Sequence, residues 1–203
     1  MNDPILENGM AKVEAGLFLA ASTQPVATLG MAKAKGLGGF ITPDRVSLRQ
    51  VETTGDSFFA SADAPFLTAL PILPDTVMGA VSAKVLVAPY ASRVKGRLLK
   101  LVPLSFARSL PVTLLQKGWV VLATKSRVTR RVLEDGATLT VRPDALVAWI
   151  GKDPSGFCPK LGMLDILLPR GPRSLFFTFH GPATVWFEGA EKPVWRRPRG
   201  VRA

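Results

Sequence analysis

The chain has 203 residues, of which 47% are apolar and 20% are charged, and its 26 Lys and Arg against 15 Asp and Glu give a formal net charge of +11. This length fits one domain or two small ones, and the apolar content excludes a chain that is disordered throughout. A single Cys and a single His exclude a disulfide framework and a cysteine-based metal cluster, and they leave few ligands for a His-based site. No cofactor or metal is therefore expected.

The positive charge is concentrated in the second part of the chain. Residues 1–82 hold five basic and eight acidic side chains (net −3), residues 83–203 hold 21 and seven (net +14), and the two parts sum to +11. No acidic residue lies between Asp75 and Glu134, or from Lys192 to Arg202. Fields of this size attract phosphate backbones and anionic lipid head groups, although a solvated basic surface is the alternative.

The first 45 residues are rich in Ala and Gly and predict an irregular N-terminal extension. The cluster Gly36-Leu37-Gly38-Gly39 lacks the Lys-Ser/Thr pair of a phosphate-binding loop, so a flexible connector is expected there.

Residues 46–190 predict an all-β domain, because short runs of Val, Leu, Phe and Thr alternate with Pro, Gly and Asp at spacings of about ten residues. The 17 prolines argue against long helices. The strands expected first are Val46–Thr53, Phe66–Ile72, Val81–Ala88, Val112–Leu115 and Trp119–Thr124.

Two stretches bear on membranes. Ser92–Val102 is free of proline and mixes basic with apolar residues, which leaves a short basic amphipathic helix open. The apolar stretches Val77–Ala91 and Leu101–Ala123 are interrupted by Lys, Arg or Pro, so no membrane-spanning helix is expected.

The C-terminal half predicts two hairpins and a buried strand. Ser126–Leu133 and Ala137–Arg142 flank an Asp-Gly turn, which tolerates the positive φ of tight hairpins. Ala145–Ile150 is continuously apolar, as in a strand covered on both faces. Leu175–Phe179 and Thr184–Glu188 flank a turn at His180–Ala183. The aromatic residues of this second pair are interpreted as core rather than as a platform for RNA bases.

The segments TLTVRPDALVAWIGKDPSG (Thr138–Gly156) and LFFTFHGPATVWFEGA (Leu175–Ala190) resemble the closing half of the Altered inheritance of mitochondria protein 24 family. The family's first motif is matched by Ala145-Leu146-Val147-Ala148-Trp149, and its second by Gly181, Pro182, Thr184, Val185 and Trp186, over a region from Trp119 to Ala190. The resemblance implies packed antiparallel sheets like those of the tryptophan RNA-binding attenuator protein, a mitochondrial location and a non-enzymatic role linked to inner-membrane organisation.

Catalysis is not expected from the residues themselves. His180 lies in a predicted turn, and no nucleophile with an orienting partner accompanies it. Cys158 has no partner cysteine. A small-molecule substrate is therefore not expected either.

The first functional hypothesis is a structural component of a mitochondrial ribonucleoprotein, most concretely the mitochondrial ribosome, that contacts rRNA and ribosomal proteins within a multi-subunit complex. Its phosphate contacts would come from basic residues flanking or within the β domain and from a basic tail, residues 191–203. These are Arg93, Lys95, Arg97, Lys100, Arg108, Arg127, Arg130, Arg131, Arg196, Arg197, Arg199 and Arg202. The alternative is an inner-membrane organising or respiratory-complex scaffold whose cations bind anionic lipid such as cardiolipin.

Overall fold

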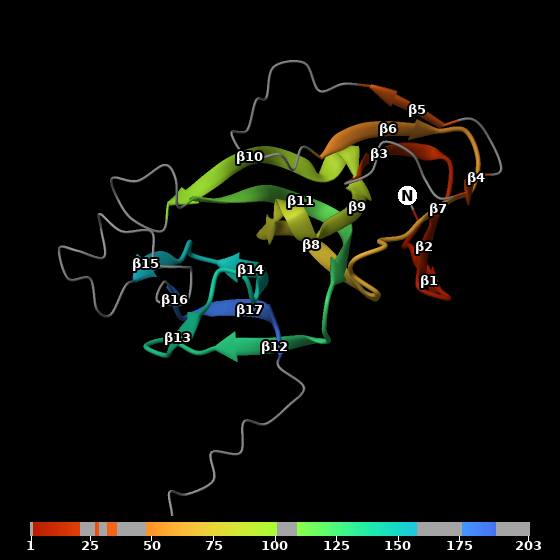
Figure 1. Ribbon diagram of the computed structural model, residues 1–203. Coiled ribbons are helices and arrows are strands. Elements are labelled where there is room, and N and C mark those ends of the chain that lie inside the picture. The colour runs from red at the N-terminus through yellow and green to blue at the C-terminus, as the bar shows by residue number, and fades with distance from the viewer. Residues whose placement is uncertain are drawn as a thin grey trace, which may run out of the picture.

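The structure is a computed structural model that describes residues 2–20, 27–28, 32–35, 48–100, 109–157 and 176–189 (Figure 1). For residues 32–35, 97, 98, 100, 109, 156 and 157 it describes the backbone only. Apart from two single-turn 3-10 segments, η1 (Ser82–Lys84) and η2 (Tyr90–Ser92), the regular elements of the described residues are all strands, and every pairing is antiparallel. The predicted all-β fold of packed antiparallel sheets is confirmed.

A ten-stranded sheet forms the centre of the molecule, in the order β12-β17-β14-β8-β11-β9-β3-β6-β5 with β10 also beside β11. Its strands are β3 (Gly16–Ala20), β5 (Ala32–Lys35), β6 (Arg49–Thr53), β8 (Phe66–Val81), β9 (Val85–Pro89), β10 (Arg93–Lys100), β11 (Ser109–Thr124), β12 (Val128–Leu133), β14 (Leu146–Gly151) and β17 (Ala183–Glu188). The two central strands, β8 and β11, each have 16 residues and pair along nearly their whole length.

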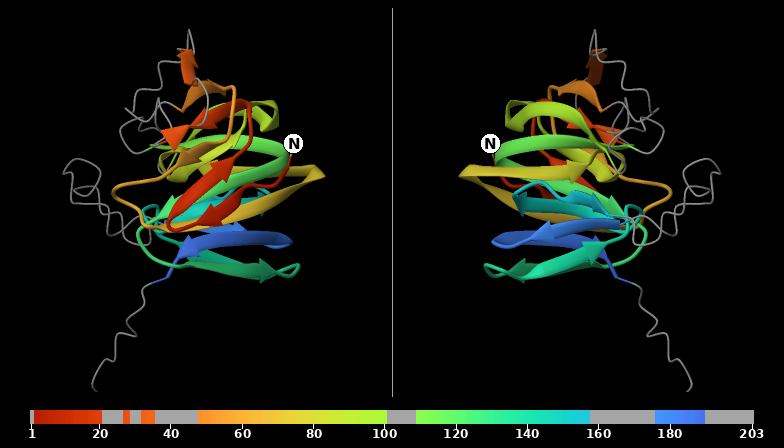
Figure 2. Two further views of the ribbon diagram at one scale, coloured as in Figure 1. Left: turned by 90° about the vertical axis from the view of Figure 1, so that its right-hand side faces the viewer. Right: turned by 90° about the vertical axis from the view of Figure 1, so that its left-hand side faces the viewer.

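Two smaller sheets each cover one half of the large sheet. One has the order β1-β2-β7-β4, and the other β13-β16-β15. Their strands are β1 (Ile5–Glu7), β2 (Met10–Val13), β4 (Ala27–Thr28) and β7 (Ser57–Phe59), and β13 (Thr138–Val141), β15 (Ser155–Phe157) and β16 (Phe176–His180). In Figure 2 the strands β5 and β6 lie at one end of the stack, and β17 and β12 lie at the other.

Three hydrophobic cores fill these layers. Phe18, Phe59 and Trp119 belong to the core beneath the four-stranded sheet, and Trp149 and Phe179 belong to the core beneath the three-stranded sheet. The third core joins side chains of β3 and β9 with those of β14 and β17 around the central strands. Four of the five aromatic residues of the second predicted hairpin therefore pack in the cores, as expected: Phe177 and Phe179 are fully buried, and Trp186 and Phe187 also contribute, whereas Phe176 is half-buried.

The two halves of the large sheet correspond strand for strand. Counting outward from the centre, β8, β14, β17 and β12 match β11, β9, β3 and β6. β3 and β17 each follow a small-sheet strand (β2, β16), and β6 and β12 each precede one (β7, β13). β9 and β14 share the buried sequence Leu-Val-Ala, at 86–88 and 146–148. Beyond β6 lies one more strand, β5, which has no counterpart beside β12 among the described strands.

The prediction of an irregular extension over residues 1–45 is wrong for residues 5–20, which form β1, β2 and β3. Phe18 is 1% exposed, and its ring lies 6.1 Å from that of Trp119. The indole N–H of Trp119 also donates to the Asn2 carbonyl at 3.0 Å. An overlooked signal was the Asn8-Gly9 pair, whose φ angles of 48° and 74° form the turn between β1 and β2. The Gly36–Gly39 cluster lies outside the described residues.

The alternative of a short helix over Ser92–Val102 is also wrong, because residues 93–100 form the strand β10. This strand pairs with β11 from Arg93 opposite Leu115 to Lys100 opposite Ser109. Pairing with a long central strand satisfies the backbone and buries Leu99 in the second core. The expected strands Val112–Leu115 and Trp119–Thr124 are two parts of β11, which bulges at Lys117 and Gly118.

The two C-terminal hairpins are wrong in their pairing, although their strands and turns are found. β12 pairs with β17 in the large sheet, and β13 pairs with β16 in the small one. Each predicted hairpin therefore arches from one sheet to the other. The physical reason is the core between the sheets: Leu133 and Val141 of the first arch meet Phe177 and Val185 of the second. If the two strands of either predicted hairpin were paired in one flat sheet, their side chains could not pack against each other across this core.

Candidate polyanion-binding site

The terminal strand β12 presents a run of exposed residues at one end of the large sheet (Figure 1). Thr129, Arg130, Arg131 and Val132 are all exposed, whereas a strand with one covered face alternates buried and exposed residues. Within the described residues β12 pairs with β17 alone. Both faces of β12 between its two ends therefore face solvent or segments outside the described ranges.

The guanidinium groups of Arg130 and Arg131 leave the strand on opposite faces, because successive side chains of a strand alternate. Arg130 lies opposite Trp186 of β17, and its guanidinium carbon is 5.9 Å from the centre of the indole ring. Contact with the electron-rich ring face favours this placement of the cation. Arg131 lies opposite Val185, on the face of the second core.

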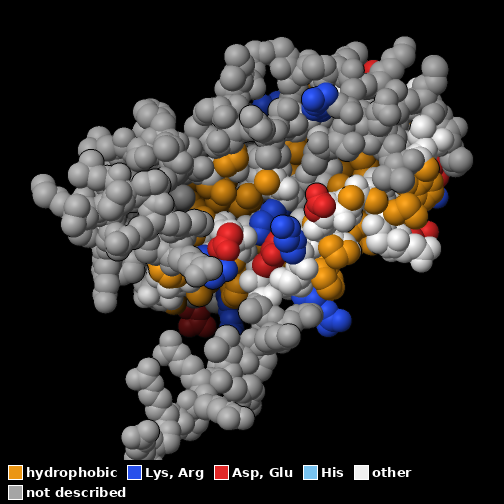
Figure 3. Space-filling model, in the orientation of Figure 1, with side chains coloured by type: hydrophobic (Ala, Val, Ile, Leu, Met, Phe, Trp, Pro, Cys, Tyr) orange, Lys and Arg blue, Asp and Glu red, His pale blue; other side chains and the backbone are white. Residues whose placement is uncertain are grey.

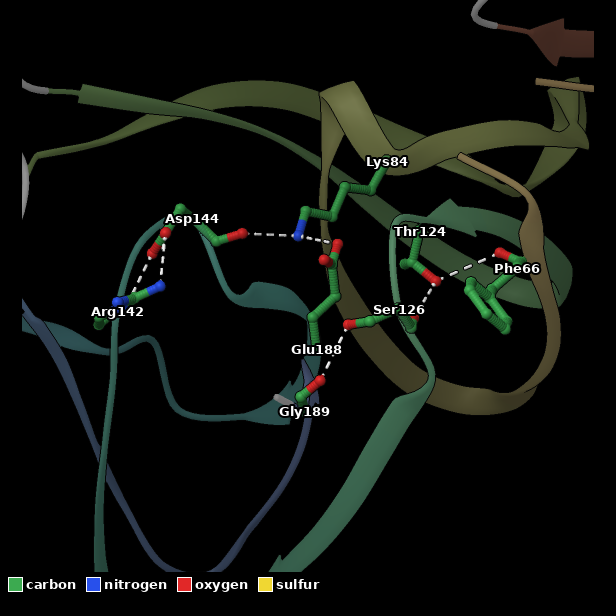
Figure 4. A network of polar contacts seen from close by, with 8 residues as sticks. All are labelled: Phe66, Lys84, Thr124, Ser126, Arg142, Asp144, Glu188 and Gly189. Atoms are coloured by element: carbon green, nitrogen blue, oxygen red, sulfur yellow. Dashed lines mark hydrogen bonds and ion pairs between the residues drawn. The ribbon is translucent and has the colours of Figure 1, made fainter. Parts of the chain in front are cut away.

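Arg127 lies just before β12, where the end of β17 is fastened to it. The Gly189 N–H donates to the Arg127 carbonyl at 3.1 Å. The Ser126 hydroxyl donates to the Gly189 carbonyl at 3.0 Å (Figure 4). The Thr124 hydroxyl donates to the Ser126 carbonyl at 2.8 Å. The chain therefore leaves β17 directly beside Arg127. Residues 190–203, which include Arg196, Arg197, Arg199 and Arg202, follow from this point and lie outside the described residues.

The acidic residue opposite the start of β12 is Glu188, and its carboxylate is paired with a cation of another element. Glu188 lies opposite Val128, and its carboxylate accepts a hydrogen bond from Lys84 of η1 (Figure 4). The same ammonium group donates to the Asp144 carbonyl at 2.8 Å, and the side chains of Lys84 and Glu188 are each 15% exposed. The Asp144 carboxylate in turn accepts two hydrogen bonds from Arg142, at 3.1 and 2.7 Å. These two carboxylates are thus balanced by cations other than those of β12.

The predicted cations fall into two groups on different strands rather than into one patch. Arg127, Arg130 and Arg131 form what is called here the β12 group. The β10 group lies on the strand beside β11, where Lys95 is exposed and Arg93 is half-buried. Only the backbone of Arg97 and Lys100 is described, and Arg108 lies outside the described residues. Figure 1 shows β10 and β12 on opposite sides of the central strands.

One exposed cation beside the β12 group was not singled out from the sequence. Lys125 lies in the turn between β11 and β12 and is exposed. Its position two residues before Arg127, in the acid-free run, was the available signal. On the face shown in Figure 3, basic and acidic side chains are mixed near the centre, and further Lys and Arg side chains lie at the lower edge, where Figure 1 places β12. Glu134 and Asp135, just after β12, are exposed acids at its far end.

The described part of the chain offers little for other chemistry. His180 is exposed at the end of β16, and no group of three or more His, Cys, Asp or Glu residues suited to a metal ion occurs within the described ranges. Cys158 lies outside them. Among the helical segments described, none has the length and apolar character needed to cross a bilayer.

The sequence matches no protein-family model and no curated protein. The structure is similar to the crystal structure of a protein from Streptococcus pyogenes, with a TM-score of 0.65 and 16% sequence identity over 89% of this chain and 87% of the streptococcal chain. A likeness at this identity concerns the fold alone. The resemblance to the Altered inheritance of mitochondria protein 24 family stays a prediction.

Proposed function

We propose that this protein is a non-catalytic structural component of a ribonucleoprotein and that its β12 group binds RNA phosphates. One observation carries the proposal: three arginines within five residues lie on a terminal strand, exposed or at its exposed end, and the basic C-terminal segment begins beside the first of them. Fixed secondary structure holds these cations in place, and the tail supplies more of them from an adjacent point.

The chemistry of the β12 group suits phosphate. An arginine side chain binds phosphate through two parallel hydrogen bonds, and its charge is retained at any physiological pH. At about 3.3 Å per residue, Arg127 and Arg131 are separated by about 13 Å along the strand. In duplex DNA one strand carries a phosphate about every 3.4 Å of the helix axis, so this length is on the scale of several phosphates of a nucleic-acid strand. The group is therefore long enough to contact several phosphates at once.

The mitochondrial ribosome, with rRNA and neighbouring ribosomal proteins as partners, is the specific assembly we propose. The mitochondrial part of this proposal rests on the family resemblance of Thr138–Gly156 and Leu175–Ala190. The alternative, an inner-membrane scaffold whose cations bind anionic lipid, rests on the same family resemblance and on the same basic residues. Residues 93–100 form the strand β10, so a basic amphipathic helix at this position does not add to the support for that alternative.

The test measures RNA affinity against salt concentration. For single-stranded RNA each phosphate contact contributes about 0.7 to the slope of log affinity on log salt, so replacing Arg127, Arg130 and Arg131 by Gln should lower the slope by about 2. Fluorescence anisotropy with a labelled RNA oligonucleotide, measured over a range of salt concentrations, gives both the affinity and the slope. The control is Arg142→Gln, which removes an arginine that is paired with Asp144. The RNA affinity of this variant should lie within twofold of that of the wild type. An unchanged slope in the triple variant would contradict the proposal.

The assembly is tested separately in cell extracts. The protein should sediment with ribosomal subunits and be released by ribonuclease or by high salt. Sedimentation entirely with membrane complexes that resist ribonuclease would contradict the ribosomal proposal and favour the membrane scaffold.

A further inference from the structure

The outer edge of β12 carries a row of backbone groups that point away from β17. The Gly189 N–H donates to the Arg127 carbonyl, so the Arg127 carbonyl points toward β17. The Glu188 N–H donates instead to Ala145, on the β14 side of β17. Inward and outward backbone groups alternate along an antiparallel strand. The N–H and C=O groups of Val128, Arg130 and Val132 therefore point outward, in the plane of the sheet.

The other half of the molecule shows what occupies the corresponding edge. β6 holds the position that matches β12, fourth from the centre, and its outer edge pairs with β5 from Ala32 opposite Thr53 to Lys35 opposite Gln50. Both β6 and β12 also lead into paired strands of a small sheet. The same fold thus accepts a further strand at this position. None of the described residues supplies one beside β12.

The side chains of β12 set the charge of the strand that would fit. Arg130 and Arg131 are exposed on the two faces of β12, and Val132 is 62% exposed. Neighbouring side chains on adjacent strands lie close together, where opposite charges stabilise the pairing and like charges weaken it. A second copy of β12 would bring arginine against arginine. The chain's own residues 192–202, which hold basic residues and no acidic one, are disfavoured for the same reason.

We propose that the outer edge of β12 is a docking site for an extended acidic segment of a partner protein, which adds to the large sheet as a strand. Backbone hydrogen bonds to Val128, Arg130 and Val132 would supply affinity, and acidic side chains beside Arg130 and Arg131 would supply specificity. This inference goes beyond the RNA proposal, because it depends on backbone groups in the plane of the sheet and not only on cationic side chains.

The test uses a capped six-residue peptide with two adjacent Glu residues flanked by Val and Thr, so that one Glu lies on each face of the sheet, and its binding is followed by fluorescence anisotropy. Val132→Pro removes an outward N–H, while no hydrogen bond to β17 is lost, and proline is tolerated at such edge positions. We expect this variant to bind the peptide at least tenfold more weakly than the wild type. The matched control, Val132→Ala, retains the N–H and should bind within twofold of the wild type.

RNA binding separates this proposal from the previous one. Val132→Pro should leave RNA affinity within twofold, since every cation is retained, whereas replacing Arg130 and Arg131 by Gln should weaken both ligands. Unchanged peptide binding by Val132→Pro would overturn strand addition, even if RNA still binds the arginines. Equal losses for peptide and RNA in Val132→Pro would also overturn it, because that result indicates damage to β12 itself.

A modified ligand tests the same point without altering the protein. A peptide of the same sequence with N-methyl groups on all its backbone nitrogens has no N–H on either edge to donate to β12, so it should bind at least tenfold more weakly. A peptide with Gln in place of Glu should also lose affinity. If the N-methylated peptide binds as well as the parent, the proposal is wrong. Self-association of the wild type that Val132→Pro abolishes, observed by analytical ultracentrifugation, would assign the edge to a second copy instead.

Discussion

Gly79 of β8 lies directly across from Trp149 of β14, and the indole ring covers it. A Cβ atom added at Gly79 would lie 2.5 Å from Cε2 and 2.6 Å from Cη2 of that ring. Contacts this short do not occur between real side chains, so Gly79→Ala forces the ring or a strand to move. Trp149 is 1% exposed and packs against Phe179 at 6.0 Å, and its ring has no flexible end that could yield.

The free energy of unfolding should fall by about 3 kcal/mol in Gly79→Ala, at the upper end of the usual cost of an extra methyl group in a packed core. For a chain of this length about 1 kcal/mol corresponds to about 2–4 °C, so Tm should fall by about 6–12 °C. Urea unfolding followed by circular dichroism, with a thermal scan, gives both quantities.

A second variant isolates the ring as the cause. Trp149→Leu alone creates a cavity and should cost about 3 kcal/mol. If the clash is with the indole, adding Gly79→Ala to this variant should cost about 2 kcal/mol less than it does in the wild type. Simple additivity of the two costs, or a Gly79→Ala protein within about 0.5 kcal/mol of the wild type, would refute this reasoning.

Three further predictions concern the rest of the molecule. Phe18→Ala should cost about 3–5 kcal/mol in urea unfolding, because the residue is core rather than extension, and a loss below about 1 kcal/mol would contradict that placement. In a double-mutant cycle, Lys84→Ala and Glu188→Ala should show a coupling of about 1–2 kcal/mol, since both side chains are largely buried, and a coupling near zero would mean that the ion pair adds nothing. The hydrogen bond and the charge of Asp56 raise the pKa of Lys12 above 10.5, so this pair stabilises the fold below pH 10.5 and its contribution is lost as pH rises through the higher folded value. The stability difference between wild type and Lys12→Gln should therefore shrink above that pH, and a difference that grows would refute the assignment.

Local features of the fold could be predicted from the sequence, whereas the partners of each strand could not. The Asp135-Gly136 turn is present, with Gly136 at φ 76° and a hydrogen bond from Ala137 to Glu134. Such a turn depends on the conformations of a few neighbouring residues. The strands on its two sides nevertheless pair with β17 and β16, which begin at least 35 residues further along the chain. That choice depends on the shared core, which no short window of sequence contains.

The basic residues of the candidate site could be named from the sequence, but the strands on which they lie and their distances in space could not. The acid-free run contains Arg127, Arg130 and Arg131, and the structure places all three at exposed positions. It could not show that Arg93 and Lys95 lie on a different strand across the sheet, because charge counts contain no information on pairing. Nor could it show that β17 ends beside Arg127. That contact arises from three hydrogen bonds around Ser126 and Gly189.

The long strands β8 and β11 have a consequence for how the molecule comes apart. Each contributes residues to the cores of both halves, so neither half keeps a complete core without the other. The two matched halves therefore should not behave as separable domains, and unfolding should follow a single cooperative transition. A fragment that starts at Trp119, where the family resemblance begins, would divide β11 in the middle and leave β14 without β8. The two matched halves should therefore form one folding unit, in which damage at either end lowers the stability of both.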